Sequence, residues 1–176
     1  MKSMRCLFSF AILSACALAN AQSPDKPGAV SDAQKTFDII KALAGAWQGS
    51  VTTDNPAWST DKPIPLSIRL ASHGNALIHE LNTGGPEVTV FYIENDGLAL
   101  IHYCDFGNRA HMAAQPSPDG KTIDFDLKDY SGSNQVGHVS RGVFTIIDPN
   151  HHTEDWTFLL ANGKPVHAHI DFKRVP

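Results

Sequence analysis

The densest group of reactive side chains in the sequence lies in residues 100–112, LIHYCDFGNRAHM. His102 and Cys104 are two residues apart, and Arg109 and His111 follow after a turn-like run. Imidazole and thiolate groups bind zinc or copper, and a thiolate beside a histidine can act as a nucleophile. The same side chains can also serve as hydrogen-bonding groups around a polar cavity. We therefore expect a functional site here, with His102 as its central polar group.

A second group of candidate residues lies nearer the C-terminus. In the segment HHTEDWTF, His152, Glu154 and Trp156 are spaced two residues apart, and His167 and His169 repeat this spacing. Neither a His-Glu-x-x-His nor a Cys-x-x-Cys motif, which would indicate a zinc site directly, occurs in the sequence. The sequence therefore leaves open whether a metal ion or haem binds, and it predicts no catalytic residue.

Short apolar runs separated by turn residues fill the sequence from Trp47 onward. The pattern predicts ten strands, at residues 47–53, 65–71, 76–81, 87–93, 97–104, 109–115, 122–128, 139–147, 152–160 and 166–174. Closure into an up-and-down barrel leaves no exposed sheet edge. We therefore predict an all-β, up-and-down antiparallel β-barrel of about ten strands, although a two-sheet sandwich would show a similar pattern.

One short helix is predicted ahead of these strands. Ser31 offers an N-cap, and Phe37, Ile40 and Leu43 recur on one helical face. Glycine commonly follows the last turn of a helix, so we expect this helix to end at Gly45.

Strand alternation predicts which side chains face the barrel interior. On the strand at 97–104, His102 and Cys104 share a face with two leucines, and we expect this face to point inward. Arg109 and His111 on the next strand are expected to close the same mouth of the barrel.

The same alternation applies to the last two strands. Trp156 belongs inside, which also carries His152 and Glu154 inward, and we expect both near the barrel mouth. His167 and His169 alternate with apolar residues and are expected to face solvent, which disfavours a metal or haem site at that pair.

A Gly-x-Trp sequence, Gly45 to Trp47, opens the first predicted strand, and Arg174 ends the last. This combination resembles the calycin barrels, the lipocalin and fatty-acid-binding group, and implies that Arg174 packs across Trp47. More widely, LAGAWQG, HYCDFGNRAHM, HHTEDWTF and DFKRV resemble a family of secreted bacterial proteins of unknown function with a lipocalin-like barrel. That family typically has Pro-Arg-Met where this chain has Ala-His-Met, and it implies a fold and secretion but no activity.

The N-terminus has the features of a secretory signal. Lys2 and Arg5 precede the apolar residues 7–18, and the segment ANA at 19–21 is a small-x-small cleavage site. We therefore predict a signal peptide at 1–21, a flexible leader at 22–30 and one barrel domain at 31–176, secreted or periplasmic. Alternatively, LSAC at 13–16 is a lipoprotein box that would anchor the chain through Cys16. The apolar run is too short for a transmembrane helix.

Composition excludes some classes of partner. Loss of residues 1–21 leaves 12 basic and 18 acidic residues, a net charge of −6, with no basic run longer than two residues. We therefore expect no binding to nucleic acid or to an anionic membrane surface. Cys104 would be the one cysteine left, so no internal disulfide can form.

Together these features predict a secreted barrel that binds a small apolar or amphipathic molecule in its interior. The residues expected to contact the ligand are His102, Cys104, Arg109, His111, His152, Glu154 and Trp156. One alternative is a metal-dependent or haem-binding protein or enzyme that uses a histidine-lined mouth. Another is a structural envelope protein whose barrel is plugged by side chains. The sequence predicts neither the ligand nor the oligomeric state.

Overall fold

A computed structural model describes residues 30–117 and 120–176 of the chain. The predicted signal peptide, the lipoprotein box and all but the last residue of the predicted leader lie outside the described residues. Within them, no helix has the length and apolar character needed to cross a membrane.

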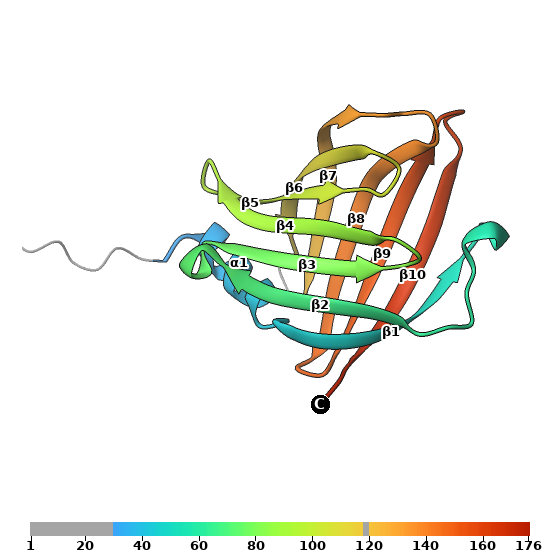
Figure 1. The fold of residues 1–176 in the computed structure, drawn as a ribbon. Coiled ribbons are helices and arrows are strands. Elements are labelled where there is room, and N and C mark those ends of the chain that lie inside the picture. The colour runs from blue at the N-terminus through green and yellow to red at the C-terminus, as the bar shows by residue number, and fades with distance from the viewer. Residues whose placement is uncertain (1–29, 118–119) are drawn as a thin grey trace, which may run out of the picture.

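The chain folds into a closed barrel of ten antiparallel strands (Figure 1). The strands are β1 (Gly45–Thr53), β2 (Ile64–Ala71), β3 (Ala76–Asn82), β4 (Pro86–Glu94), β5 (Gly97–Tyr103), β6 (Asn108–Pro116), β7 (Thr122–Gly132), β8 (Gly137–Asp148), β9 (His151–Leu160) and β10 (Pro165–Arg174). Each strand pairs with its neighbours in sequence, and β1 pairs with β10 to close the barrel, with Trp47 opposite Arg174. The up-and-down barrel predicted from the sequence is confirmed, and the sandwich alternative is wrong.

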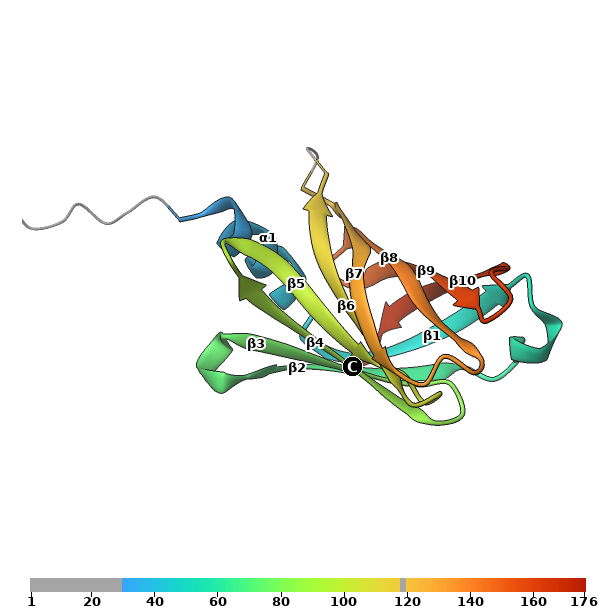
Figure 2. The same ribbon diagram turned by 90° about the horizontal axis from the view of Figure 1, so that it is seen from above.

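Among residues 30–117 and 120–176, one α-helix, α1 (Asp32–Lys41), precedes the barrel and contacts β4 and β5 (Figure 2). The side chain of Ser31 accepts a hydrogen bond from the backbone N–H of Gln34, as expected for an N-cap. The helix ends at Lys41, four residues before the predicted Gly45, because the following residues form turns that lead directly into β1. The buried residues of α1 include Phe37 and Ile40, which join the barrel core.

The end of the barrel near α1 is closed by Trp47 and Arg174. The Trp47 indole N–H donates to the carbonyl of Leu43 over 2.8 Å, and the Arg174 guanidinium lies 4.2 Å from the Trp47 ring centroid. Arg174 also donates to the carbonyls of Ala42 and Ala44. The stacking that the family resemblance implies is present. We call this the closed end, and the opposite one the open end.

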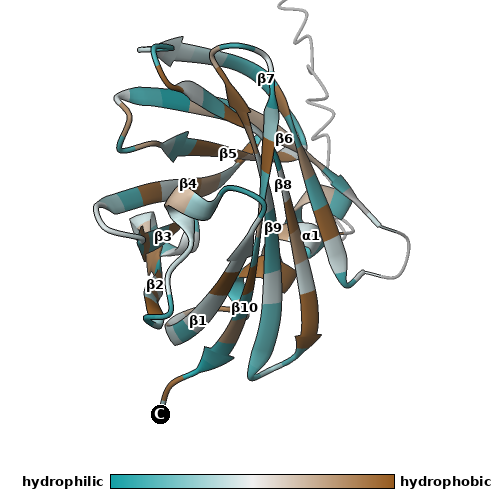
Figure 3. Cartoon of the chain, turned by 90° about the vertical axis from the view of Figure 1, so that its right-hand side faces the viewer, coloured by the Kyte–Doolittle hydropathy of each residue, from teal (hydrophilic) through white to brown (hydrophobic). Residues whose placement is uncertain are grey.

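Hydropathy alternates along many of the strands (Figure 3), and the buried side chains that alternate with exposed ones, as in β2, form an apolar interior. In the core, Phe91, Phe125 and Phe144 pack edge to face with ring centroids 5.4–5.7 Å apart. Because β1 starts at the closed end and the topology is up and down, odd-numbered strands run toward the open end and even-numbered strands run back. Strand number and position in the strand therefore decide how deep each inward side chain lies.

Two short 3-10 turns occur in the connections. One, η1 (Pro56–Trp58), lies between β1 and β2 at the open end, and the other, η2 (Ser72–Gly74), joins β2 to β3. The η2 turn lies between the predicted strands 65–71 and 76–81, where a connection is expected, whereas η1 has no counterpart among the predicted elements.

Candidate ligand-binding cavity

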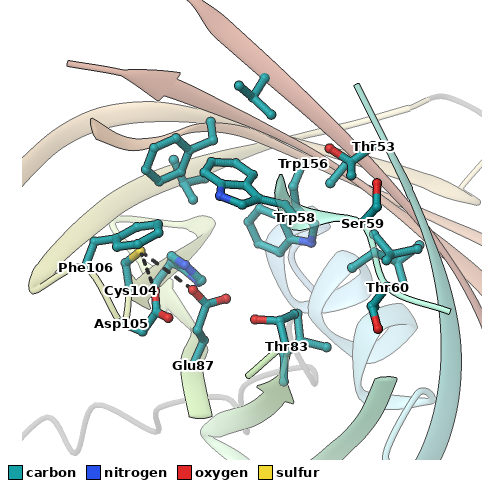
Figure 4. Close-up of a pocket in the computed structure, with 18 of the residues that line it drawn as sticks. Thr53, Trp58, Ser59, Thr60, Thr83, Glu87, Cys104, Asp105, Phe106 and Trp156 are labelled. Carbon is teal, nitrogen blue, oxygen red and sulfur yellow. Dashed lines mark hydrogen bonds between the residues drawn. The ribbon is translucent and has the colours of Figure 1, made fainter. Parts of the chain in front are cut away.

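A cavity of about 300 Å³ lies inside the open end of the barrel (Figure 4). Its walls come from β1, β3, β4, β5, β8, β9 and β10 and from the connections β1–β2, β3–β4 and β5–β6. The lining residues are Val51, Thr53, Ala57, Trp58, Ser59, Thr60, His79, Leu81, Thr83, Glu87, His102, Cys104, Asp105, Phe106, Val139, Trp156, Phe158, Val166, Ala168 and Ile170. This volume is at the lower end of the range for small-molecule sites, which favours a small ligand.

Aromatic rings form one wall of the cavity. Trp58 contributes its ring from the η1 turn and packs edge to face on Phe158, with ring centroids 5.1 Å apart. Phe106, from the β5–β6 connection, lies 5.5 Å from Phe158 and 6.2 Å from Trp58. Rings brought together from three elements give an apolar surface that can contact the body of a ligand.

A polar cluster of Glu87, Cys104 and Asp105 lies at another side of the cavity (Figure 4). The Cys104 Sγ atom is 3.7 Å from Glu87 Oε1 and 3.7 Å from Asp105 Oδ1. Burial, together with the charge of nearby Asp105, raises the pKa of Glu87 to about 7. Burial also raises the pKa of the Cys104 thiol to about 12, so the group is a thiol rather than a thiolate at neutral pH.

His102 lies beside this cluster, on the inner face of β5. It is 4% exposed, its Nδ1 shares a 2.9 Å hydrogen bond with Thr89 Oγ1, and its ring centroid lies 5.3 Å from that of Trp156. Burial lowers the pKa of His102 to about 4, with a smaller contribution from nearby His79. At neutral pH His102 is therefore an uncharged imidazole that can donate or accept a hydrogen bond.

The floor of the cavity is held by a buried network centred on Glu154. Its Oε1 accepts from His79 Nε2 over 2.9 Å and from His152 Nε2 over 3.1 Å, and its Oε2 accepts from Trp156 Nε1 over 2.9 Å. Burial alone would raise the pKa of Glu154, but the two histidines outweigh it and hold the pKa well below its ordinary value. His79 and Trp156 line the cavity, whereas Glu154 lies beneath and fixes their orientation.

Three of the seven residues predicted to contact a ligand, His102, Cys104 and Trp156, line the cavity. The prediction that Arg109 and His111 close the same mouth is wrong, because both side chains lie on the outer face of the barrel. Ala110 is opposite His102 and fully buried, so its two neighbours point outward. Arg109 is exposed, and His111 contacts Glu94 and Asp129 on the outer surface at 3.1 Å each.

The expected depth of His152 and Glu154 is also wrong. Both point inward as predicted, but β9 starts at the closed end, so its first residues lie far from the mouth. The His152 ring centroid is 4.3 Å from that of Trp47 and 5.0 Å from that of Phe172. His167 and His169 point away from the cavity, as the alternation predicts.

Most of the other lining residues were not among the predicted ligand contacts, and Glu87 and Trp58 are the two that matter most for the chemistry of the cavity. Glu87 shares a strand face with inward Thr89 and Phe91, so strand alternation could have identified it. Trp58 lies in an irregular connection where no periodic pattern applies, and its position depends on packing against Phe158.

Comparison with known proteins supports the fold. No protein-family model and no curated protein sequence matches the chain. A protein of unknown function from the DUF3598 family of Nostoc punctiforme has a similar structure, with a TM-score of 0.54 and 15% identity over 77% of this chain. The match covers 48% of the Nostoc protein, so this chain spans about half of its length. This likeness shows a shared fold.

Two further solved structures also match. An odorant-binding protein from bovine nasal mucosa has a TM-score of 0.35 and 12% identity, over 78% of this chain and 74% of its own. Lobster apocrustacyanin A1 has a TM-score of 0.31 and 16% identity, over 85% and 73% of the two chains. Both TM-scores are below 0.5, so no property of either protein is assigned to this chain.

Proposed function

We propose that the open-end cavity binds a small amphipathic molecule. The observation that carries this proposal is the composition of the cavity, in which aromatic rings from three elements face a few polar groups on one side. An apolar surface that contacts the body of a ligand, with few polar groups to orient it, is typical of small-molecule sites. The apolar part would lie against Trp58, Phe106 and Phe158, and the polar head group would lie near His102 and Glu87.

The charges of the lining residues favour particular head groups. Neither lysine nor arginine occurs among the lining residues, whereas Glu87 and Asp105 both do. A carboxylate head group would meet like charge in a partly desolvated site, which is unfavourable. In the absence of a bound cation, we therefore expect alcohols, aldehydes or amines to bind more tightly than the carboxylates of the same chain length.

A cavity-filling substitution tests the proposal. Val166 is 4% exposed and lines the cavity, whereas Val175 follows β10 and is 39% exposed. Val166→Phe should weaken binding of the apolar fluorophore N-phenylnaphthylamine by ~10-fold or more, because the added ring occupies ligand volume. Val175→Phe is the matched control and should leave the dissociation constant unchanged. Equal binding by both variants and the unaltered protein would place the fluorophore elsewhere and contradict the proposal.

We further propose that the protein acts outside the cytoplasm, as the N-terminal sequence predicts. Expression of the full chain in a bacterium, followed by fractionation and intact-mass measurement, tests this. Secretion predicts a chain that begins at Gln22, whereas the lipoprotein alternative predicts a lipid-modified N-terminus at Cys16. Recovery of the uncleaved chain from the cytoplasm would contradict both.

A further inference from the structure

Three side chains of different metal-binding types converge at the rim of the cavity. Glu87 comes from β4, His102 from the inner face of β5, and Cys104 from the residue just after β5. One candidate ligand atom from each, a carboxylate oxygen, a ring nitrogen and the thiol sulfur, lies within 4.8 Å of the other two. We propose that these three residues form a zinc site whose remaining coordination position opens into the cavity.

The chemistry of the three ligands favours zinc. Zn²⁺ binds thiolate, imidazole and carboxylate groups at bond lengths of about 2.0–2.3 Å, and sites with three protein ligands leave a position for water or another molecule. Magnesium and calcium prefer sets composed of oxygen atoms, which this cluster does not provide. The 3.7 Å between Cys104 Sγ and Glu87 Oε1 is close to the spacing of two ligands on one tetrahedral ion.

A hydrogen bond with Thr89 holds the His102 ring in an orientation suited to metal binding. Its buried hydroxyl shares a 2.9 Å hydrogen bond with Nδ1 of His102, and among the described residues the structure shows no hydrogen bond to Nε2. Metal-binding histidines typically donate their second ring N–H to a hydrogen-bond acceptor, which fixes both the tautomer and the ring orientation, and the Thr89 hydroxyl oxygen can accept in this way. With Nδ1–H donating to Thr89, Nε2 presents its lone pair for a metal ion.

The local charge also favours a bound cation. Glu87 and Asp105 place two carboxyl groups beside the thiol, and none of the residues that line the cavity is a lysine or arginine. Binding of Zn²⁺ would form a zinc–thiolate bond, break the S–H bond of Cys104 and release its proton to the buffer. The zinc ion would compensate the negative charge of Cys104 and Glu87.

Occupation of this site would change the ligand preference of the cavity. This consequence rests on the proposed function, whereas zinc binding itself does not. With zinc present, the open position would accept an anionic head group, so carboxylates should displace N-phenylnaphthylamine better than the corresponding alcohols. With a chelator present, the order should reverse because the negative charges of the rim are uncompensated.

Cobalt provides a direct test, because Zn²⁺ has no visible spectrum. The purified protein, expressed from the full sequence, is reduced, freed of metal and titrated with Co²⁺, and Zn²⁺ is then added to displace the cobalt. In a second titration the zinc dissociation constant is measured by competition with a chromophoric chelator. We expect one equivalent of Co²⁺ to produce a thiolate-to-cobalt charge-transfer band that Zn²⁺ abolishes. Cys104→Ser should remove the band, and Cys104→Ser and Glu87→Gln should each raise the zinc dissociation constant by at least ~10-fold.

His111→Ala is the matched control for His102→Ala. His111 lies on the outer surface between two carboxylates, those of Glu94 and Asp129, and so reports on adventitious surface binding. His102→Ala should lose tight zinc binding, and His111→Ala should retain it; circular dichroism shows whether each variant is folded. Absence of the charge-transfer band, or tight binding that survives Cys104→Ser and Glu87→Gln, would overturn the site. Fluorophore titration in the presence of chelator tests the proposed function separately.

Discussion

The carboxylate of Glu154 is fully buried and accepts hydrogen bonds from three side chains. A buried carboxylate is costly unless nearly all of its acceptor capacity is used. Each of the three donor side chains also packs against other residues. Trp156 lines the cavity and His79 contacts Phe91. His152 contacts the ring of Trp47. The network therefore connects the cavity floor to the closed end, although Glu154 contacts no ligand itself.

Glu154→Gln should lower the free energy of unfolding by about 3 kcal/mol at neutral pH, because the amide NH₂ meets N–H donors without accepting from them. The native-state pKa of Glu154 lies below the ordinary value of 4.5. Its contribution is therefore complete above pH 4.5 and is lost as the pH falls through the native-state pKa. Urea denaturation across this range should show the difference between the two proteins shrinking with acidification.

Glu80→Gln is the control for this prediction. Glu80 pairs with Arg69 at 3.3 Å on the exposed face of the barrel, and such pairs contribute about 0–1 kcal/mol. A loss for Glu154→Gln no larger than the loss for Glu80→Gln would contradict a structural role for the buried network.

Among the elements, closure between β1 and β10 depends on a small residue. Gly49 is opposite Phe172, and a Cβ atom on Gly49 would lie 2.5 Å from the Phe172 ring and 2.9 Å from Ile170 Cγ2. Phe172 is fully buried and stacks on His152, so its ring cannot move aside at low cost.

Gly49→Ala should therefore lower the free energy of unfolding by about 1–3 kcal/mol through overpacking at the barrel seam. Gly97, the first residue of β5, is the control, because the atom nearest to its added Cβ would lie at an ordinary 3.5 Å. Gly97→Ala should change stability by less than about 0.5 kcal/mol in the same thermal or urea unfolding measurement. Equal stability of the two variants would show that the β1–β10 register is incorrect.

The alternation of apolar and polar residues along the strands allowed the secondary structure to be predicted from the sequence. Apolar residues at every second position identified the ten strands and placed His102 and Trp156 inward, because a sheet with one buried face enforces that alternation. Arg109 and His111 were misplaced because the β5–β6 hairpin register decides their face, and a slip of one residue reverses it. Tyr103 opposite Arg109 sets that register in the structure.

For the molecule as a whole, depth along the barrel is the property that local patterns miss. His152 was expected at the mouth, yet β9 is an odd-numbered strand and starts at the closed end. Counting strands from Trp47 would have given this result. The position of Trp58 could not be obtained in this way, because a connection without periodicity is placed by its tertiary contacts alone.

The complete barrel is packed at one end and hollow at the other. Around Trp47 and Phe144 the interior is filled by side chains, whereas about 300 Å³ is unfilled beneath Trp58. A barrel plugged throughout would leave no such cavity, so the arrangement favours a binding protein over a purely structural one.

The most direct test of ligand binding is a crystal structure of the protein with a bromine-labelled medium-chain alcohol. The alcohol places an anomalous scatterer at the end of its apolar chain. We expect a bromine peak inside the barrel, close to Trp58, Phe158 and Val166, with the hydroxyl near His102. A bromine peak confined to the outer face, with side chains filling the cavity, would contradict this expectation.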